Sequence, residues 1–484
     1  MIIISIIIRH FYLQKNRPVE TLIGLKRMTS VDAESIFNML TSVLQQFSKD
    51  WSTVLAVCFD GASTMSGSIS RVQARCKQEN NNIFYILCYA HCLNLALIDS
   101  ICEKSNTKSG LKNSSLIFNF LGTVQFVYTF LENSPIRHAV LENIAKESGQ
   151  RFLTLKSLST TRWACRAEAV SSIKKNYNII LSALHNICDD CTIPEIQEKG
   201  GLFKQLQTFE FIFSLCMMEP ILQMILIASK SLQSSNLDLL TAVQLINSLK
   251  KSLISMRYSE QYDETFNKCL KICKEHDIEI PEVRNRKVST KVDSIKNQHM
   301  FVSKSEELKV TVYYKTLDIL INGLHSRFTQ ESLDMINAVG NNMISLEIHQ
   351  TNLYEVLQTI FLISHEGLVA ELRILKSVPN GSSTKAVYDW LDFLKENQRQ
   401  NVFPNFKKVL IHFATIPVTS CSCERVFSKL PIVKSKLRST MLQERLESFL
   451  LLFVEQEKLM NVQIEEVIDE FKSMNNERER RLVL

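Results

Sequence analysis

Two carboxylates stand where acidic residues commonly do chemistry. Asp60 directly follows the apolar run 54–59, so it is expected at the carboxyl end of a buried strand, where α/β folds place metal ligands and catalytic groups. Glu424 lies in the segment 417–428, where a serine can cap a helix and place this glutamate in the first turn. Each acid also has a plain structural explanation. Asp60 can form a turn or cap after a strand, and Glu424 can simply stabilise a helix dipole.

Cys88 and His91 have the Cys-x-x-His spacing of half a zinc site. A complete site needs a second pair of ligands, and no pair in ligand register lies nearby in the sequence. Cys58, Cys76 and Cys102 are loose candidates. The alternative is a buried thiol beside a hydrogen-bonded histidine, with no metal.

Arg162 and Trp163 form a basic and aromatic pair in a polar segment, and the chain has only three tryptophans. A tryptophan next to a cation can stack on an exposed nucleic-acid base. The alternative is a tryptophan at the edge of the core that anchors its own loop.

The elements that must position these residues begin with a β-rich stretch. Apolar runs rich in β-branched residues predict strands, at 2–8, 21–25, 54–59, 84–88 and finally 151–155. Thr29 and Asp32 have the spacing of a capping box, which predicts a helix before the strand that leads to Asp60. The order β-β-α-β with a carboxylate after the last strand is an α/β pattern.

Helical patterns replace the strands farther along the chain. Apolar residues recur at helical spacing in long segments such as 213–232, 237–254 and 346–375. The polar and basic stretch 283–305 predicts a linker or an exposed loop. We therefore divide the chain into an α/β part at 1–165, a helical insertion at 166–400 and a C-terminal region at 401–484.

An unusually apolar helix is expected near the C-terminus. Its apolar side chains lie three or four positions apart and form a broad stripe, comprising Leu442, Leu446, Phe449, Leu450 and Phe453. Such a helix must be buried on more than one side. One side can pack on the α/β core, and the other can pack either on a second copy or on the chain's own helical insertion.

Composition excludes several classes of protein. Of 484 residues, 45% are hydrophobic and 22% are charged, which fits a globular chain and argues against wholesale disorder. The net charge of +6 permits a nucleic-acid partner without requiring one. The opening apolar run lacks the pattern of a secretory signal and is too short to span a bilayer, and no other segment is expected to do so. The 13 cysteines are therefore expected to be mostly free thiols in a reducing compartment, with no membrane partner.

Four segments, taken in order, resemble the hAT superfamily of DNA transposases. They are Asp60–Gly67, Cys88–Leu95, Thr161–Trp163 and Thr419–Ser428, and Leu437–Leu446 resembles the C-terminal dimerisation segment of that superfamily. The closest likeness is to domesticated descendants such as zinc finger MYM-type protein 1-like proteins. The resemblance extends over nearly the whole chain.

The resemblance implies a fold and a chemistry. The fold is a ribonuclease-H-like core interrupted by a large helical domain and followed by a dimerisation region. The chemistry is strand transfer by two Mg²⁺ ions held by three carboxylates, of which Asp60 would be the second and Glu424 the third. By the same resemblance Trp163, next to Arg162, would stack on a flipped base. Cys88 and His91 would lie beside the active site. The protein would be nuclear and would pair with a second copy or with a related hAT-derived protein.

One family feature is not found in this sequence. The family's first aspartate ends a strand that precedes the one matching residues 2–8, whereas Asp32 and Asp50 are not at a strand end. The family's N-terminal zinc finger is not found either. We therefore expect a domesticated or truncated transposase-like protein that is catalytically inactive, needs no cofactor and acts through dimerisation and nucleic-acid binding.

Two alternatives stay open. The chain can be a fragment of an active Mg²⁺-dependent transposase, with the first aspartate and the zinc finger encoded upstream. It can also be a purely helical interaction scaffold, although the β-β-α-β start and Asp60 argue against that.

Overall fold

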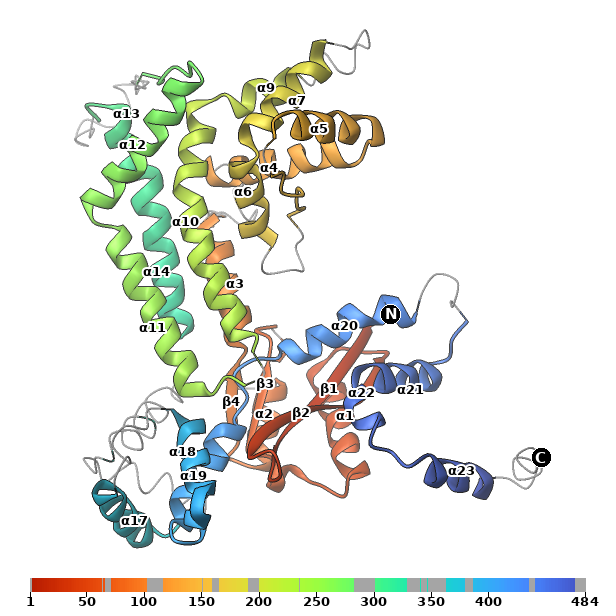
Figure 1. The fold of residues 1–484 in the computed structure, drawn as a ribbon. Helices are drawn as coiled ribbons and strands as arrows, with labels where there is room; N and C mark the ends of the chain where they lie inside the picture. The colour runs from red at the N-terminus through yellow and green to blue at the C-terminus, as the bar shows by residue number, and fades with distance from the viewer. Residues whose placement is uncertain are drawn as a thin grey trace, which may run out of the picture. The chain divides into compact units, whose positions relative to one another are not determined.

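The structure is a computed structural model in which helices predominate (Figure 1). It describes residues 2–62, 64–65, 71–101, 116–149, 151–158, 165–189, 200–234, 236–282, 301–328, 340, 346, 363–378, 386–434 and 440–474. The chain divides into two compact units. Unit 1 contains Met1–Cys88, Ser235–Thr241 and Asp334–Leu484, and unit 2 contains Tyr89–Ser234 and Ala242–Leu333.

These units do not follow the boundaries expected from the sequence, 1–165, 166–400 and 401–484. Unit 2 begins at Tyr89, the first residue of the helix that follows the strand Phe84–Leu87. The strand expected at 151–155 is wrong, since residues 151–158 have no regular secondary structure. There the Leu153 N–H and C=O groups bond the Asn176 side chain instead of a neighbouring strand.

Unit 1 opens with a long hairpin of two antiparallel strands, β1 (Ile2–Tyr12) and β2 (Arg17–Met28). The strands predicted at 2–8 and 21–25 fall inside them. Asn16 makes the reversal in the left-handed region, with φ 53°, a conformation that asparagine tolerates better than most residues. Its side chain is buried and donates to the Leu391 carbonyl at 2.9 Å. The hairpin tip is thereby attached to a distant helix.

A second sheet of two parallel strands follows. Its elements are α1 (Ala33–Gln46), η1 (Trp51–Thr53), β3 (Ala56–Phe59), α2 (Val72–Glu79) and β4 (Phe84–Leu87). β3 and β4 pair in parallel, with α2 between them in the chain, as a crossover connection requires. The predicted capping box is wrong in its partners. Asp32 itself is the N-cap of α1, since its carboxylate accepts from the Ser35 N–H at 2.8 Å.

The C-terminal part of unit 1 is helical. Its elements are α17 (His365–Ser377), α18 (Val387–Lys395), η4 (Glu396–Asn401), α19 (Pro404–Thr415), α20 (Cys421–Val433), α21 (Gln443–Val454), α22 (Gln456–Leu459) and α23 (Ile464–Ser473). Helices α20 and α21 pack on the hairpin around a core shared by Leu22, Leu25 and Val426. The hairpin and the C-terminal helices are therefore one folded body.

Helix α21 also satisfies the outer edge of β2. The Glu447 carboxylate accepts from the Leu25 N–H at 2.9 Å, and the Glu455 carboxylate accepts from the Leu22 N–H at 2.7 Å. Gln443 donates to the Leu25 carbonyl. Side chains thus take the place of a neighbouring strand, which prevents uncontrolled pairing at that edge.

Unit 2 is built from helices in the part of the chain that the structure describes. They are α3 (Tyr89–Ile101), α4 (Leu116–Glu132), α5 (Pro135–Glu147), α6 (Cys165–Lys175), α7 (Tyr177–Asp189), α9 (Gly200–Leu206), α10 (Phe209–Leu232), α11 (Leu239–Met256), α12 (Ser259–Glu275), α13 (Lys304–Leu308), η2 (Lys309–Tyr314) and α14 (Lys315–Arg327). The helices expected at 213–232 and 237–254 correspond to α10 and α11. Of the helix expected at 346–375, residues 365–375 lie in α17 and most of the rest lies outside the described residues.

Helix α10 corrects the expectation that no segment has the length of a membrane span. It has 24 residues and a mean hydropathy of 2.0 in its most apolar window, and 67% of that window is buried inside the protein. A mostly buried apolar helix of this kind is typical of the core of a soluble domain.

Candidate functional site

Asp60 lies where the sequence analysis placed it, directly after β3. Its side chain is exposed and accepts from the Ala62 N–H at 3.4 Å, so it also closes a local turn. β4 ends beside it, because the Cys88 N–H donates to the Phe59 carbonyl at 2.9 Å. The ends of both parallel strands therefore meet at this carboxylate.

Glu424 reaches the same place from the far end of the sequence. It lies in the first turn of α20, as expected, although Ser420 occupies the N-cap position without a capping side-chain hydrogen bond. Burial, the charge on Cys88 and the charge of Asp60 together raise the pKa of Glu424 to about 7. Asp60 and Glu424 thus interact electrostatically, which makes this pair the candidate acidic centre.

Three hydrogen-bonded thiols, those of Cys58, Cys88 and Cys421, lie next to the acidic centre. The Ser420 N–H donates to the Cys88 sulfur at 3.3 Å. Hydrogen bonds from the Cys421 and Cys58 thiols, together with this N–H, lower the pKa of Cys88, whereas those same bonds raise the pKa of Cys421 and Cys58. Cys88 is therefore the acceptor of the cluster. Its hydrogen bond with Ser420 connects the end of β4 to the start of α20, the helix that carries Glu424.

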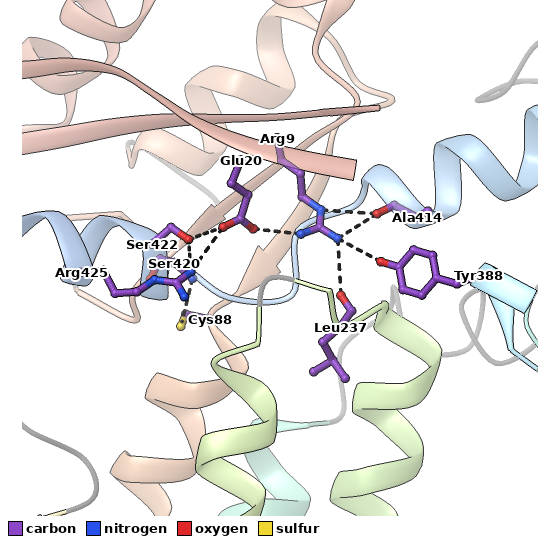
Figure 2. Close-up of polar contacts among 9 residues, drawn as sticks. All are labelled: Arg9, Glu20, Cys88, Leu237, Tyr388, Ala414, Ser420, Ser422 and Arg425. Atoms are coloured by element: carbon purple, nitrogen blue, oxygen red, sulfur yellow. Dashed lines mark hydrogen bonds and ion pairs between the residues drawn. The ribbon is translucent and has the colours of Figure 1, made fainter. Parts of the chain in front are cut away.

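An ion-pair network holds the hairpin against α19 and α20 (Figure 2). The Arg9 guanidinium binds the Glu20 carboxylate at 2.9 Å and donates to the Ala414 carbonyl at 3.0 Å. Glu20 also accepts from the Ser422 hydroxyl and lies 3.8 Å from Arg425. Both charges of the Arg9–Glu20 pair are largely buried, with 6% and 15% of their side chains exposed.

Sequence reasoning missed this network. Arg9 and Glu20 lie directly opposite each other in the hairpin register, and opposite charges facing across two strands stabilise a pair. A signal was therefore present, since both charges interrupt stretches of strand that are otherwise mostly apolar. Their attachment to Ala414 and Ser422 had no local signal, because those residues are roughly 400 positions away.

The structure does not describe the position of every predicted site residue relative to this centre. Arg162 and Trp163 lie outside the described residues. His91 lies in α3, which belongs to unit 2, whereas Cys88 is the last residue of the neighbouring segment of unit 1. Among the residues that the structure describes, no group of three or more His, Cys, Asp or Glu side chains is arranged to hold a metal ion. Within the described part of the chain, Asp60 and Glu424 are the two carboxylates of this centre that could contribute ligands to Mg²⁺.

The predicted apolar stripe on α21 is divided between two environments. Leu446 and Leu450 are buried in the core with the hairpin, and Phe453 is partly buried against the same core. Leu442 and Phe449 lie on the outer side, with 76% and 40% of their surface exposed. The inner half of the stripe is therefore used within the chain, and the outer half remains accessible.

Residues 373–457 match the family model of the hAT family C-terminal dimerisation region. The match supports hAT-family membership.

This hAT region begins inside α17 and ends inside α22. It therefore includes α20, which carries Glu424, and α21, which carries the exposed apolar stripe. Its family description points to a transposase-related protein that self-associates or pairs with a related protein. One segment of the chain thus contains both the acidic residue and the candidate dimerisation face.

Proposed function

We propose that this chain is a domesticated or truncated hAT transposase-like protein that acts as a homodimer and does not cleave DNA. The observation that carries the proposal is the match at 373–457 together with the exposed outer side of α21. Exposed apolar side chains in a contiguous patch favour a protein partner. The finer likeness to zinc finger MYM-type protein 1-like proteins is part of the same proposal.

The order of elements in unit 1 supports a ribonuclease-H-like ancestry. An antiparallel hairpin is followed by a helix and by a parallel β-α-β unit, with Asp60 after β3. The chain then passes through the helices of unit 2 and returns to unit 1 with Glu424 on α20. This arrangement fits a core interrupted by a helical insertion, and it argues against a purely helical scaffold.

Catalytic inactivity is proposed from the chemistry of the acidic centre. A pair of Mg²⁺ ions requires several convergent oxygen ligands, and Asp60 and Glu424 supply two carboxylates. Glu20 on β2 is a further acid near the start of α20, but it is already bound by Arg9 and Arg425. No cofactor is therefore proposed for this form, and Mg²⁺ would bind only if another segment completed the centre.

The nuclease part of the proposal is tested with the full chain on supercoiled DNA, with Mg²⁺ or Mn²⁺. We expect no nicking above the level of the Asp60→Asn variant. Metal-dependent nicking that Asp60→Asn abolishes would favour the alternative, a fragment of a working transposase. DNA binding through Arg162 and Trp163 and a nuclear location belong to the proposal, and a binding assay with Trp163→Ala tests the former.

The dimer part is tested by sedimentation of the full chain at micromolar concentration. Truncation before α21 is unsuitable, because Leu446 and Leu450 fill the core of unit 1. Phe449→Glu should weaken association, since this side chain is exposed, whereas Glu444→Lys at an exposed position on another side of α21 should not. A full chain that is monomeric throughout this range would contradict the proposal.

A further inference from the structure

Helix α23 follows the matched hAT region and has an apolar face. Ile464, Val467, Ile468 and Phe471 occur at the i, i+3, i+4, i+7 spacing that places side chains on one side of a helix. None of the residues of α23 is buried, and 70% of the Ile464 surface and 54% of the Val467 surface are exposed. An isolated helix of 10 residues is only marginally stable in water. Packing of this face would therefore stabilise α23.

A second exposed apolar face lies on the outer side of α21. Phe449 and Leu452 lie on one stripe of the helix, Leu442 is its N-cap residue, and all three are exposed. Arg445 lies on the same stripe, with its guanidinium 5.4 Å from the centre of the Phe449 ring. Since Leu446 and Leu450 point into the core, this outer face is not needed for the fold of unit 1.

The acidic residues of α23 lie on the side of the helix away from its apolar face. The polar side of α23 carries four acids and one lysine, at Glu465, Glu466, Asp469, Glu470 and Lys472. The outer stripe of α21 presents the Arg445 cation, and the adjacent helix α20 carries Arg425 and Lys429. Arg425 is already bound to Glu20, and α21 also carries the exposed Glu444, so the apolar side chains rather than the charges carry the proposed contact.

From these observations we infer that α23 of one copy docks on the outer face of α21 of a second copy, and that the second copy does the same in return. The inference rests on the proposed dimerisation and names the surface that would carry it. The matched dimerisation region ends at residue 457, and α23 begins only seven positions later. The proposed contact is thus continuous with that region.

Two-fold symmetry doubles the proposed contact between α23 and α21. In a two-fold dimer, a contact between two different patches is necessarily made twice. Both apolar faces of each copy are then covered, and no patch is left to recruit a third chain. Docking of α23 on α21 of its own chain would cover the same faces in a monomer, and the experiment distinguishes the two arrangements.

The test uses sedimentation of the full chain and two paired variants. Val467→Glu with Ile468→Glu changes the face of α23, and Leu442→Glu with Leu452→Glu changes the face of α21. Each should weaken association at least about tenfold. Lys472→Glu is the control for α23, because it changes the net charge equally on the polar side. Ser428→Glu with Asn461→Glu, two exposed positions outside that face, is the control for α21, and neither control should dissociate the dimer.

A mixture of the two variants provides the sharpest readout. Each variant alone has both reciprocal contacts broken, whereas a mixed dimer retains one intact contact between the normal α23 of one copy and the normal α21 of the other. The mixture should therefore associate more strongly than either variant alone. A mixture that remains as monomeric as its components would overturn the reciprocal exchange.

Other outcomes separate this inference from the proposed function. If Val467→Glu with Ile468→Glu leaves the dimer intact while Phe449→Glu dissociates it, the role of α23 is wrong and dimerisation through α21 stands. If the full chain is a monomer that these α23 substitutions destabilise toward heat, α23 docks within its own chain. A monomeric full chain contradicts both proposals.

Discussion

The negative charge of Asp60 contributes to the raised pKa of Glu424, although the two residues come from opposite ends of the sequence. Asp60 follows β3, and Glu424 lies in the first turn of α20. Both belong to unit 1, and all of unit 2 lies between them in the chain. The acidic centre therefore exists only after the chain has returned to the sheet of β3 and β4.

The raised pKa of Glu424 makes stability depend on pH. Its folded value of about 7 lies above the ordinary 4.5, so folding favours the protonated acid. This stabilisation is complete below the unfolded pKa and is lost as the pH rises through the folded pKa. In chelator at about pH 8, Glu424→Gln should therefore be more stable than the wild type by ~1–2 kcal/mol, a value reduced for solvent screening of a partly exposed group.

Urea unfolding at several pH values measures this difference. The pH-dependent difference should vanish below the pKa of the unfolded acid, where Glu424 is protonated in both the folded and the unfolded chain. Glu444→Gln is the control, because Glu444 is exposed on α21 and should give no pH-dependent difference. A Glu424→Gln variant that is less stable than the wild type at high pH would contradict the assigned cause.

The Arg9–Glu20 pair should contribute far more than an exposed pair. Arg9→Met leaves Glu20 largely buried with only its weaker contacts to Ser422 and Arg425. Loss of one partner from a buried pair typically costs ~3–5 kcal/mol, and we expect the lower end here because Arg425 remains. Arg17→Met breaks the exposed pair with Asp392 and should cost less than about 1 kcal/mol.

A double-mutant cycle with Glu20→Gln completes the comparison. The two single losses should not add, because each removes the same contact. Equal unfolding free energies for Arg9→Met and Arg17→Met would show that the network does not hold the hairpin to α19 and α20.

Glu447 should stabilise the edge of β2 through its hydrogen bond to the Leu25 N–H. Glu447→Ala leaves this N–H without its carboxylate partner and also removes the ion pair with Lys26 at 3.1 Å. An expected cost of ~1–3 kcal/mol follows from an unsatisfied backbone donor. Amide hydrogen exchange at Leu25 should become faster, whereas Glu444→Ala should leave that exchange rate unchanged.

The two sides of α21 should respond differently to substitution. Leu450→Ala opens a cavity in the core and should destabilise unit 1 by ~2–5 kcal/mol. Leu452→Ala removes an exposed side chain and should change unfolding of the dissociated chain by less than about 0.5 kcal/mol. Thermal unfolding of dilute protein measures both. Similar losses for the two variants would mean that the outer side of α21 is also packed within the chain.

The sequence by itself determined the local features of this protein. β-branched runs predicted both strands of the hairpin, and the strand that ends before Asp60 was predicted from its apolar residues. Periodic apolar residues predicted α10 and α11, and Glu424 was placed correctly in the first turn of its helix. These features depend on neighbours within a few positions, so short-range sterics and burial patterns are sufficient to specify them.

Only the tertiary structure decided which distant residues meet. Long-range contacts depend on where the whole chain folds back, and no local pattern encodes that. The attachment of Arg9 to Ala414, the cluster of Cys58, Cys88 and Cys421, and the carboxylates that cover the edge of β2 all arise in this way. The same reason explains α21, whose apolar circumference was visible in the sequence. Packing on the hairpin determined that Leu446 and Leu450 are core residues, and it left Leu442 and Phe449 exposed.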